Sequence, residues 1–175
     1  MINAIFIDRD GTLIDEPETE TIDAWDKFKI RDNISSLSRL QDAGYKFFII
    51  TNQEGIGEGK LEKNFYDAAN DKLLAALKKD SIKIEKIYTC PHPISENCAC
   101  RKPKTKFIDE AVNDFKIDRK KSWIIGDRTS DIKLALASGI RNVFIKSGLH
   151  KIEGLKPNFV ADDLNKAVEY ILKNL

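Results

Sequence analysis

The sequence predicts an α/β protein in which helices cover both faces of a doubly wound, mainly parallel sheet. Short apolar runs, each ended by polar residues or glycine, recur along the chain and are typical of buried parallel strands. Segments with apolar residues at helical spacing separate these runs. Gly44 and Gly139 follow two of these segments, at the position where a left-handed helix cap favours glycine. Alternation of strand and helix is the pattern of a doubly wound sheet.

The expected elements follow one another in a regular order. Residues 4–7 (AIFI) form the first strand, since four apolar residues precede a polar loop that contains glycine. The same pattern predicts four more strands, at residues 46–51, 83–89, 122–125 and 142–145. Helical spacing predicts helices at residues 34–40, 65–77, 107–115 and 134–137, the last including Leu134 and Ala137. Residues 162–175 are expected to form a final helix.

No repeat, low-complexity tract or linker rich in Pro, Gly or Ser divides the chain. We therefore expect a single domain over residues 1–175. Residues 10–32 form the longest segment without clear periodicity, and a loop of this length next to a site often covers that site.

The charges nearly balance, with 29 Lys and Arg against 28 Asp and Glu. A net charge of +1 provides no long-range field that would attract nucleic acid or a membrane surface, so neither is expected as a partner. No apolar run approaches the roughly 18 to 20 residues that cross a bilayer, and the first residues lack the pattern of a secretory signal. We expect a cytoplasmic protein that is a monomer or a weak homo-oligomer.

Acidic residues follow two of the expected strands, at the sheet edge where ligands bind in open α/β folds. The first strand leads into Asp8 and Asp10, and the strand at 122–125 leads into Asp127 and Asp131. A single Asp in such a place is most often a turn or helix-cap residue. Four carboxylates at one edge, however, repel one another unless a cation is present, and hard oxygen ligands suit Mg²⁺. The sequence therefore predicts a magnesium site.

Two further residues point to phosphoryl transfer at this edge. Lys102 offers a positive charge and Thr51 offers a hydroxyl donor, which are the groups that a transferring phosphoryl needs. The alternative for Lys102 is a solvated basic turn, which its position between Arg101 and Pro103 disfavours.

These residues belong to a set of four ordered motifs: Asp8-x-Asp10-Gly11-Thr12, Thr51-Asn52-Gln53, Arg101-Lys102-Pro103 and Gly126-Asp127-x-x-x-Asp131. The set resembles the motifs of the haloacid dehalogenase superfamily of phosphatases and spans nearly the whole chain. The resemblance implies a Rossmann-like fold and a phosphomonoesterase that forms an aspartyl phosphate.

The resemblance also implies a role for each motif residue. Asp8 would be the nucleophile, and Asp10 would be the general acid and base. Mg²⁺ would be held by Asp8, Asp127 and the backbone carbonyl of Asp10. Thr51 and Lys102 would stabilise the transferring phosphoryl group. Asp131 would hold Lys102 or a water on the metal, and the residues expected to contact or orient the substrate are Arg9, Asn52, Gln53 and Arg101.

All three cysteines and one of the two histidines lie in Cys90-x-His92-x5-Cys98-x-Cys100. An odd number of cysteines within eleven residues indicates metal ligands rather than a disulfide framework. The segment looks like the zinc loop of the histidinol-phosphatase and heptose-bisphosphate-phosphatase branch of the superfamily. Three thiolates and one imidazole would complete a closed tetrahedral Zn²⁺ site, which implies a structural metal. Ordinary small core residues are the alternative.

Two features favour histidinol phosphate as the substrate. Only residues 93–97 separate His92 from Cys98, whereas the heptose enzymes of this branch carry a longer insertion. Residues 13–17 (LIDEP) and 26–28 (DKF) resemble the histidinol phosphatases, and Glu16 would complement a cationic substrate at the pocket rim. Glu54 and Gly59 depart from that pattern.

Three alternatives stay open from the sequence. One is a phosphatase of heptose 1,7-bisphosphate or of another sugar phosphate. The second, of a different class, is a non-catalytic binding module stabilised by zinc. The third is a nucleic-acid 3′-phosphatase, which the near-neutral charge disfavours.

Overall fold

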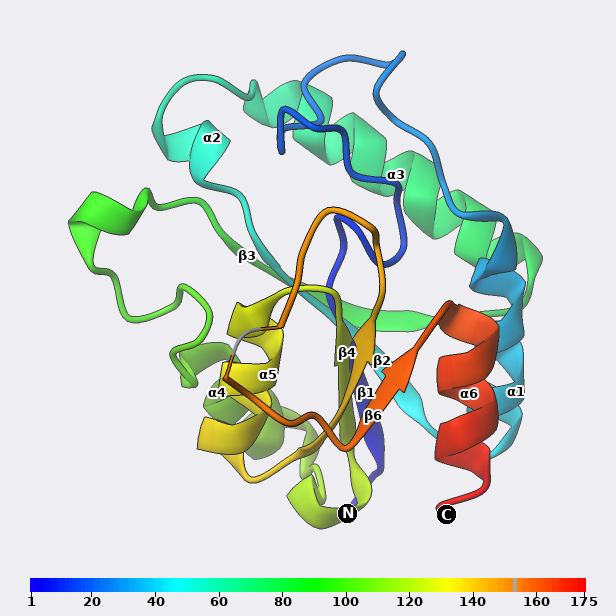
Figure 1. The fold of residues 1–175 in the computed structure, drawn as a ribbon. Helices are drawn as coiled ribbons and strands as arrows, with labels where there is room; N and C mark the ends of the chain where they lie inside the picture. The colour runs from blue at the N-terminus through cyan, green and yellow to red at the C-terminus, as the bar shows by residue number, and fades with distance from the viewer. Residues whose placement is uncertain (153) are drawn as a thin grey trace.

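The structure, a computed structural model, describes residues 1–152 and 154–175. One parallel sheet runs through it in the strand order β3-β2-β1-β4-β5-β6 (Figure 1). The strands are β1 (Ala4–Ile7), β2 (Lys46–Asn52), β3 (Ile84–Cys90), β4 (Trp123–Gly126), β5 (Arg141–Ile145) and β6 (Phe159–Ala161). Because the chain moves outward from β1 to β3 and then returns to β4, the strand order reverses between β1 and β4. Ligands bind at such switch points in open α/β sheets.

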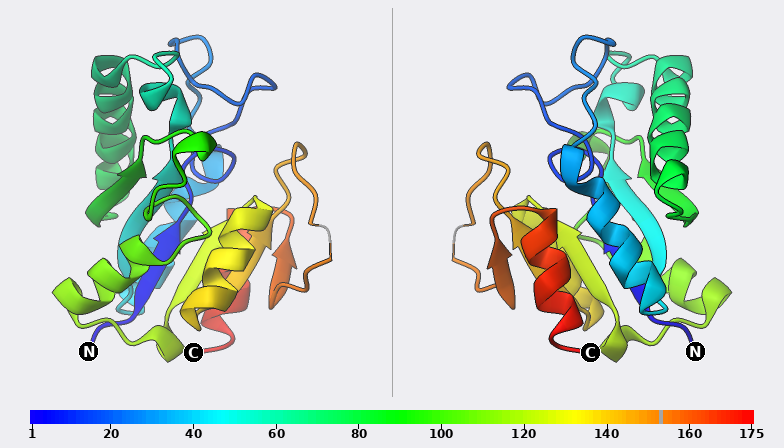
Figure 2. Two further views of the ribbon diagram at one scale, coloured as in Figure 1. Left: turned by 90° about the vertical axis from the view of Figure 1, so that its left-hand side faces the viewer. Right: turned by 90° about the vertical axis from the view of Figure 1, so that its right-hand side faces the viewer.

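Helices cover both faces of the sheet, as predicted. They are α1 (Ser38–Asp42), α2 (Glu54–Gly57), α3 (Lys63–Lys79), α4 (Lys106–Phe115), α5 (Thr129–Ser138) and α6 (Leu164–Leu172). Helices α1, α3 and α6 lie on one face, and α4 and α5 lie on the other (Figure 2). Short 3-10 turns are η1 (Asp32–Leu37), η2 (Ile94–Glu96) and η3 (Arg119–Lys121).

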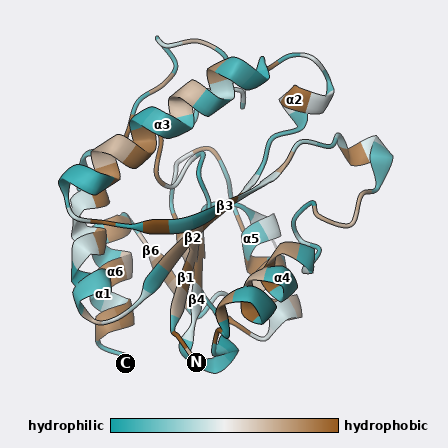
Figure 3. Ribbon diagram, turned by 180° about the vertical axis from the view of Figure 1, so that it is seen from behind, coloured by the Kyte–Doolittle hydropathy of each residue, from teal (hydrophilic) through white to brown (hydrophobic). Residues whose placement is uncertain are grey.

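Side chains of the central strand β1 point alternately to the two faces of the sheet and so contribute to two hydrophobic cores. Ile5 and Ile7 of β1 pack in the cluster under α1, α3 and α6, while Ala4 and Phe6 pack in the cluster under α4 and α5. All four residues are buried, as expected for a parallel strand covered on both faces. Hydrophobic and hydrophilic residues alternate along α3 and α4 (Figure 3), because each helix has one buried face.

The structure corrects two details of the prediction. A sixth strand, β6, was missed, since it has three residues and only Ala161 of them is buried. Ala137 was expected on the buried face of α5 but is exposed, and Ile132, Leu134 and Ala135 are the buried apolar residues of that helix. Residues 10–31, most of the segment expected to lack periodicity, contain no helix or regular strand, and η1 begins at Asp32. None of the described helices combines the length and apolar character needed to cross a membrane.

Candidate active site

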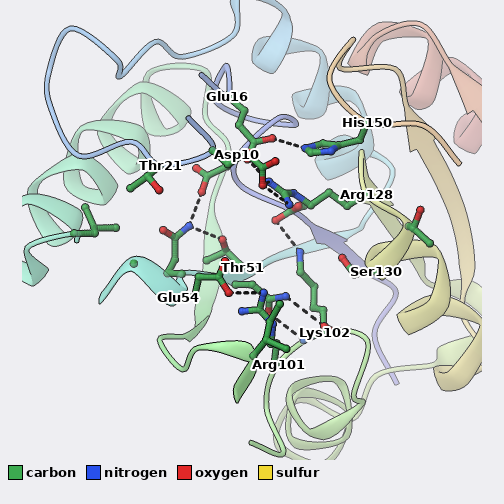
Figure 4. Close-up of a pocket in the computed structure, with 18 of the residues that line it drawn as sticks. Asp10, Glu16, Thr21, Thr51, Glu54, Arg101, Lys102, Arg128, Ser130 and His150 are labelled. Carbon is green, nitrogen blue, oxygen red and sulfur yellow. Dashed lines mark hydrogen bonds and ion pairs between the residues drawn. The ribbon is translucent and has the colours of Figure 1, made fainter. Parts of the chain in front are cut away.

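The predicted site residues meet at the switch point of the sheet. β1 ends directly before Asp8, and β4 ends directly before Asp127, so both carboxylates leave adjacent parallel strands at the same edge. A cavity of about 1040 Å³ opens there (Figure 4). Among the residues that line it are Asp8, Asp10, Thr51, Asn52, Gln53, Arg101 and Lys102.

Lys102 lies between two carboxylates at the base of the cavity. Its Nζ is 2.8 Å from Oδ1 of Asp8 and 2.7 Å from Oδ1 of Asp131, and it also donates to the carbonyl of Ile50 at 3.0 Å. Burial alone would lower the pKa of Lys102, but Asp131 and Asp8 hold it above its ordinary value. The lysine is therefore a fixed positive charge within a nearly dry part of the site.

Asp127 is the buried carboxylate that most needs a cation. It is 0% exposed, and neither of its oxygens has a hydrogen-bond partner in the described part of the chain. Carboxylate oxygens of Asp8, Asp127 and Asp131 lie within 4.8 Å of one another. Burial, followed by the charges of Asp8 and Asp131, raises the pKa of Asp127 to about 8. A hard divalent ion such as Mg²⁺ would relieve this repulsion, so the donor set fits that metal.

Two glycines leave the space that these carboxylates occupy. A Cβ on Gly11, which has φ +80°, would lie 2.0 Å from Oδ2 of Asp127. A Cβ on Gly126 would lie 2.3 Å from Cγ of Asp131. Since real Cβ contacts are never this short, both positions require glycine for the acidic side chains to keep their places.

Asp10 is oriented by its neighbours rather than by the other carboxylates. Nη1 of Arg9 is 2.7 Å from Oδ1 of Asp10, and Nε2 of Gln53 donates to Oδ2 of Asp10 and to the hydroxyl of Thr51. Arg9 was expected to contact the substrate. Its side chain is 1% exposed and stacks over the ring of Tyr66, so it is placed to position Asp10 instead.

Asn52 holds the segment that carries Lys102. Oδ1 of Asn52 accepts a hydrogen bond from the backbone N–H of Lys102 at 3.0 Å, and Nδ2 donates to the carbonyl of Lys102 at 3.3 Å. Asn52 was expected to orient the substrate. Although it lines the cavity, both polar atoms of its side chain fasten β2 to the segment around Lys102.

Glu16 lies deeper than the rim position expected for it. Its side chain is 1% exposed, its carboxylate pairs with Arg128, and its Oε2 lies 2.8 Å from Nε2 of His150. The charge that was expected to meet a cationic substrate is therefore already balanced within the protein. Neither Arg128 nor His150 was predicted. Arg128 directly follows Asp127, at a strand end that was examined but where the residue was left as an unspecified motif position, whereas His150 lies beyond the end of β5, which was not examined for site residues.

The four predicted zinc ligands form a compact group beside the cavity. Sγ of Cys90 lies 3.5 Å from Sγ of Cys98 and 3.3 Å from Sγ of Cys100, and Nδ1 of His92 is 3.6 Å from Sγ of Cys90. Zn–S bonds of about 2.3 Å in a tetrahedron place two sulfurs about 3.8 Å apart. The cluster thus has the ligand set and nearly the dimensions of a closed zinc site.

Arg101 was expected to contact the substrate; it lines the cavity, but its guanidinium is engaged by the protein. Nη2 lies 2.8 Å from Oε2 of Glu54 in α2, and Nη1 donates to the carbonyl of His92 at 3.3 Å. The residue therefore connects the segment of the cysteine cluster to α2.

Comparison with known proteins gives matches over most of the chain. A family model described as HAD-hydrolase-like matches residues 99–167. The histidine biosynthesis bifunctional protein HisB of Campylobacter jejuni is 42% identical over 141 residues, which are 79% of this chain and 40% of that protein. The HisB protein of Buchnera aphidicola is 40% identical over 75% of this chain and 38% of its own length. The chain thus spans about 40% of the length of these relatives.

The fold also matches solved structures. The crystal structure of D,D-heptose 1,7-bisphosphate phosphatase from B. bronchiseptica, complexed with magnesium and phosphate, superimposes with a TM-score of 0.87 at 22% identity. The match covers 99% of this chain and all of that one. At this identity the likeness establishes the fold, including the switch point at which the candidate site lies.

Proposed function

Because this chain belongs to the haloacid dehalogenase (HAD)-like hydrolases, we propose that it is a magnesium-dependent phosphatase that acts through an aspartyl phosphate on Asp8. The observation that carries the proposal is the buried group in which Lys102 bridges Asp8 and Asp131 beside the unpartnered carboxylate of Asp127. Buried charges are costly unless they are paired or bind an ion. A phosphoryl-transfer site accounts for why the fold keeps them.

Asp8 would act as the nucleophile. One oxygen of its carboxylate attacks phosphorus while the bond from phosphorus to the ester oxygen breaks, which leaves the phosphoryl group on Asp8. The positive charge of Lys102 neutralises the equatorial oxygens, whose charge is spread in the transition state, and the hydroxyl of Thr51 donates a hydrogen bond to them. The backbone N–H of Arg9 donates to Oδ1 of Asp8 at 2.7 Å and fixes the rotation of the carboxylate.

Asp10 moves the protons in both half-reactions. Its carboxyl group gives a proton to the leaving alkoxide, and its carboxylate then takes one from the water that cleaves the acyl phosphate. Arg9 and Gln53 hold the two oxygens of Asp10, so the side chain is oriented before the substrate enters. One carboxyl group therefore serves as acid and then as base.

Two metals are part of the proposal. Asp8, Asp127 and the backbone carbonyl of Asp10 would hold Mg²⁺, which neutralises charge on the phosphate when bound. Cys90, His92, Cys98 and Cys100 would hold a structural Zn²⁺ that stiffens the segment leading to Arg101 and Lys102.

We propose histidinol phosphate as the substrate. The support is the 42% identity to a protein named for histidine biosynthesis and the short segment between His92 and Cys98. The second candidate is heptose 1,7-bisphosphate, which the name of the structurally similar phosphatase favours.

The test is a phosphate-release assay on purified protein with Mg²⁺, using histidinol phosphate, heptose 1,7-bisphosphate and an aryl phosphate. We expect turnover of all three esters to require Mg²⁺, with the highest kcat/KM for histidinol phosphate. A higher kcat/KM for the bisphosphate would replace the substrate assignment. Background rates on every ester would contradict the enzymatic function and favour a binding module.

A further inference from the structure

Glu54 and Arg101 form an ion pair across two walls of the cavity. Oε2 of Glu54, in α2, lies 2.8 Å from Nη2 of Arg101, which belongs to the segment that follows the cysteine cluster (Figure 4). The side chains are 43% and 20% exposed, and both line the cavity. The pair thus faces the space that the leaving group of a substrate would occupy.

The backbone around the pair holds it in this arrangement. The N–H of Gly57 donates to the carbonyl of Pro91 at 3.0 Å, and the N–H of Gln53 donates to the carbonyl of Cys90 at 2.7 Å. A Cβ on Gly57 would lie 2.5 Å from the oxygen of Pro91, so α2 packs directly on residues 90–91. Because α2 carries Glu54 and packs on residues 90–91, the carboxylate of Glu54 is held opposite the guanidinium of Arg101.

Of the other cations that line the cavity, Lys104 donates to Asn97 and to the carbonyl of Cys98, while two are paired with carboxylates. Nζ of Lys60 lies 2.8 Å from Glu58, and Arg128 pairs with Glu16. A phosphate carries about −1.5 to −2 charges at pH 7 and binds best to a free, bidentate arginine. Arg101 has the guanidinium for such binding, but this group already pairs with Glu54, whose negative charge would repel the second phosphate of a substrate. A neutral or cationic leaving group meets no such repulsion.

We propose that Glu54 is a specificity-determining residue that selects esters with a single phosphate and disfavours substrates with a second one. The inference rests on the proposed phosphatase function and deepens it. Glu54 acts by neutralising Arg101 and by presenting its own charge to the leaving group, and it does not touch the reacting atoms. Its effect is therefore expected in KM more than in kcat.

The test compares Glu54→Gln with the matched variant Glu18→Gln, which removes one exposed carboxylate from the lining of the same cavity and leaves the pairs of Arg101 and Lys60 intact. Values of kcat and KM are measured on histidinol phosphate and on heptose 1,7-bisphosphate. In Glu54→Gln we expect kcat/KM to rise about tenfold for the bisphosphate and to fall for histidinol phosphate, mainly through KM. Glu18→Gln should keep the wild-type ratio within about twofold.

Changes of opposite sign in kcat/KM for the two esters would separate an effect on specificity from structural damage, because a damaged site would lose activity on both esters. The inference is overturned if kcat/KM of Glu54→Gln falls on both esters, or if the ratio of kcat/KM on the two esters is the same in the wild-type protein and both variants. In either case continued hydrolysis of an aryl phosphate leaves the proposed function standing. Failure of the wild-type protein on every ester overturns both.

Discussion

Nζ of Lys102 lies 2.7 Å from Oδ1 of Asp131, and both side chains are almost completely buried. Lys102→Met would leave Asp131 and Asp8 as buried carboxylates without their cation. We expect a loss of about 3–5 kcal/mol in the free energy of unfolding and a decrease of about 100-fold or more in kcat. Urea denaturation and steady-state kinetics measure the two effects. Lys106→Met, which breaks an exposed pair with Glu110, is the control and should change neither by much.

The pH dependence of stability should report Asp127. Its pKa is raised to about 8 by burial and by Asp8 and Asp131, whereas an unfolded chain has an Asp pKa of about 3.9. Between these values the metal-free native protein retains a proton that the unfolded chain has released. Its stability therefore falls as pH rises, by up to about 1.4 kcal/mol per pH unit.

Magnesium binding should remove this penalty, since the ion takes the place of the proton on Asp127. We expect the increase in Tm on adding Mg²⁺ to be larger at pH 8 than at pH 5, and to be nearly independent of pH in Asp127→Asn. Thermal melts with and without Mg²⁺ measure it. An equal increase at both pH values in the wild-type protein would be the contrary result.

Replacing Gly11 by a residue with a Cβ should displace the carboxylate of Asp127. Both Gly11 and Gly59 have positive φ, +80° and +71°, but only at Gly11 would a Cβ meet the carboxylate of Asp127. Alanine at either position adds backbone strain of about 1–2 kcal/mol. Gly11→Ala should in addition weaken Mg²⁺ binding and destabilise the protein by about 1–3 kcal/mol more. Equal denaturation midpoints and Mg²⁺ affinities for the two variants would contradict the steric argument.

The cysteine cluster should contain about one zinc ion per chain. Cys98→Ser should lower the zinc content and increase hydrogen exchange in the segment from Cys90 to Lys102, because the metal fastens it. The activity should decrease while remaining dependent on Mg²⁺. His150→Ala is the control, since His150 contacts Glu16 and lies outside the cluster, and its zinc content should be unchanged. Wild-type protein without zinc would contradict the assignment.

The sequence predicted most of the fold because its strands are short, apolar and buried on both faces. β6 was not predicted, because a three-residue edge strand with an exposed Val160 shows little hydrophobic periodicity. Asp8, Asp127, Asp131 and Lys102 were brought together correctly, since parallel strands end at one edge and fix where the following residues lie.

The partners of individual side chains were harder to predict. Glu16 meets Arg128 and His150 across separations of 112 and 134 residues, and both belong to loops whose course depends on tertiary packing. Arg9 shows the same limit, because its Nη1 pairs with the adjacent Asp10, and its Nε and Nη2 are buried without a hydrogen-bond partner among the described residues. Local sequence patterns predicted the strands and loops to which these residues belong, but not the direction in which their side chains point.

The most direct test of the account is mass spectrometry of protein quenched in acid during turnover of histidinol phosphate with Mg²⁺. The proposed mechanism predicts that the peptide containing Asp8 gains the mass of one phosphoryl group, and that Asp8→Asn shows neither the modification nor turnover while keeping its fold by circular dichroism. Phosphate on another residue, or near-wild-type turnover by Asp8→Asn, would contradict the assignment of Asp8 as the nucleophile.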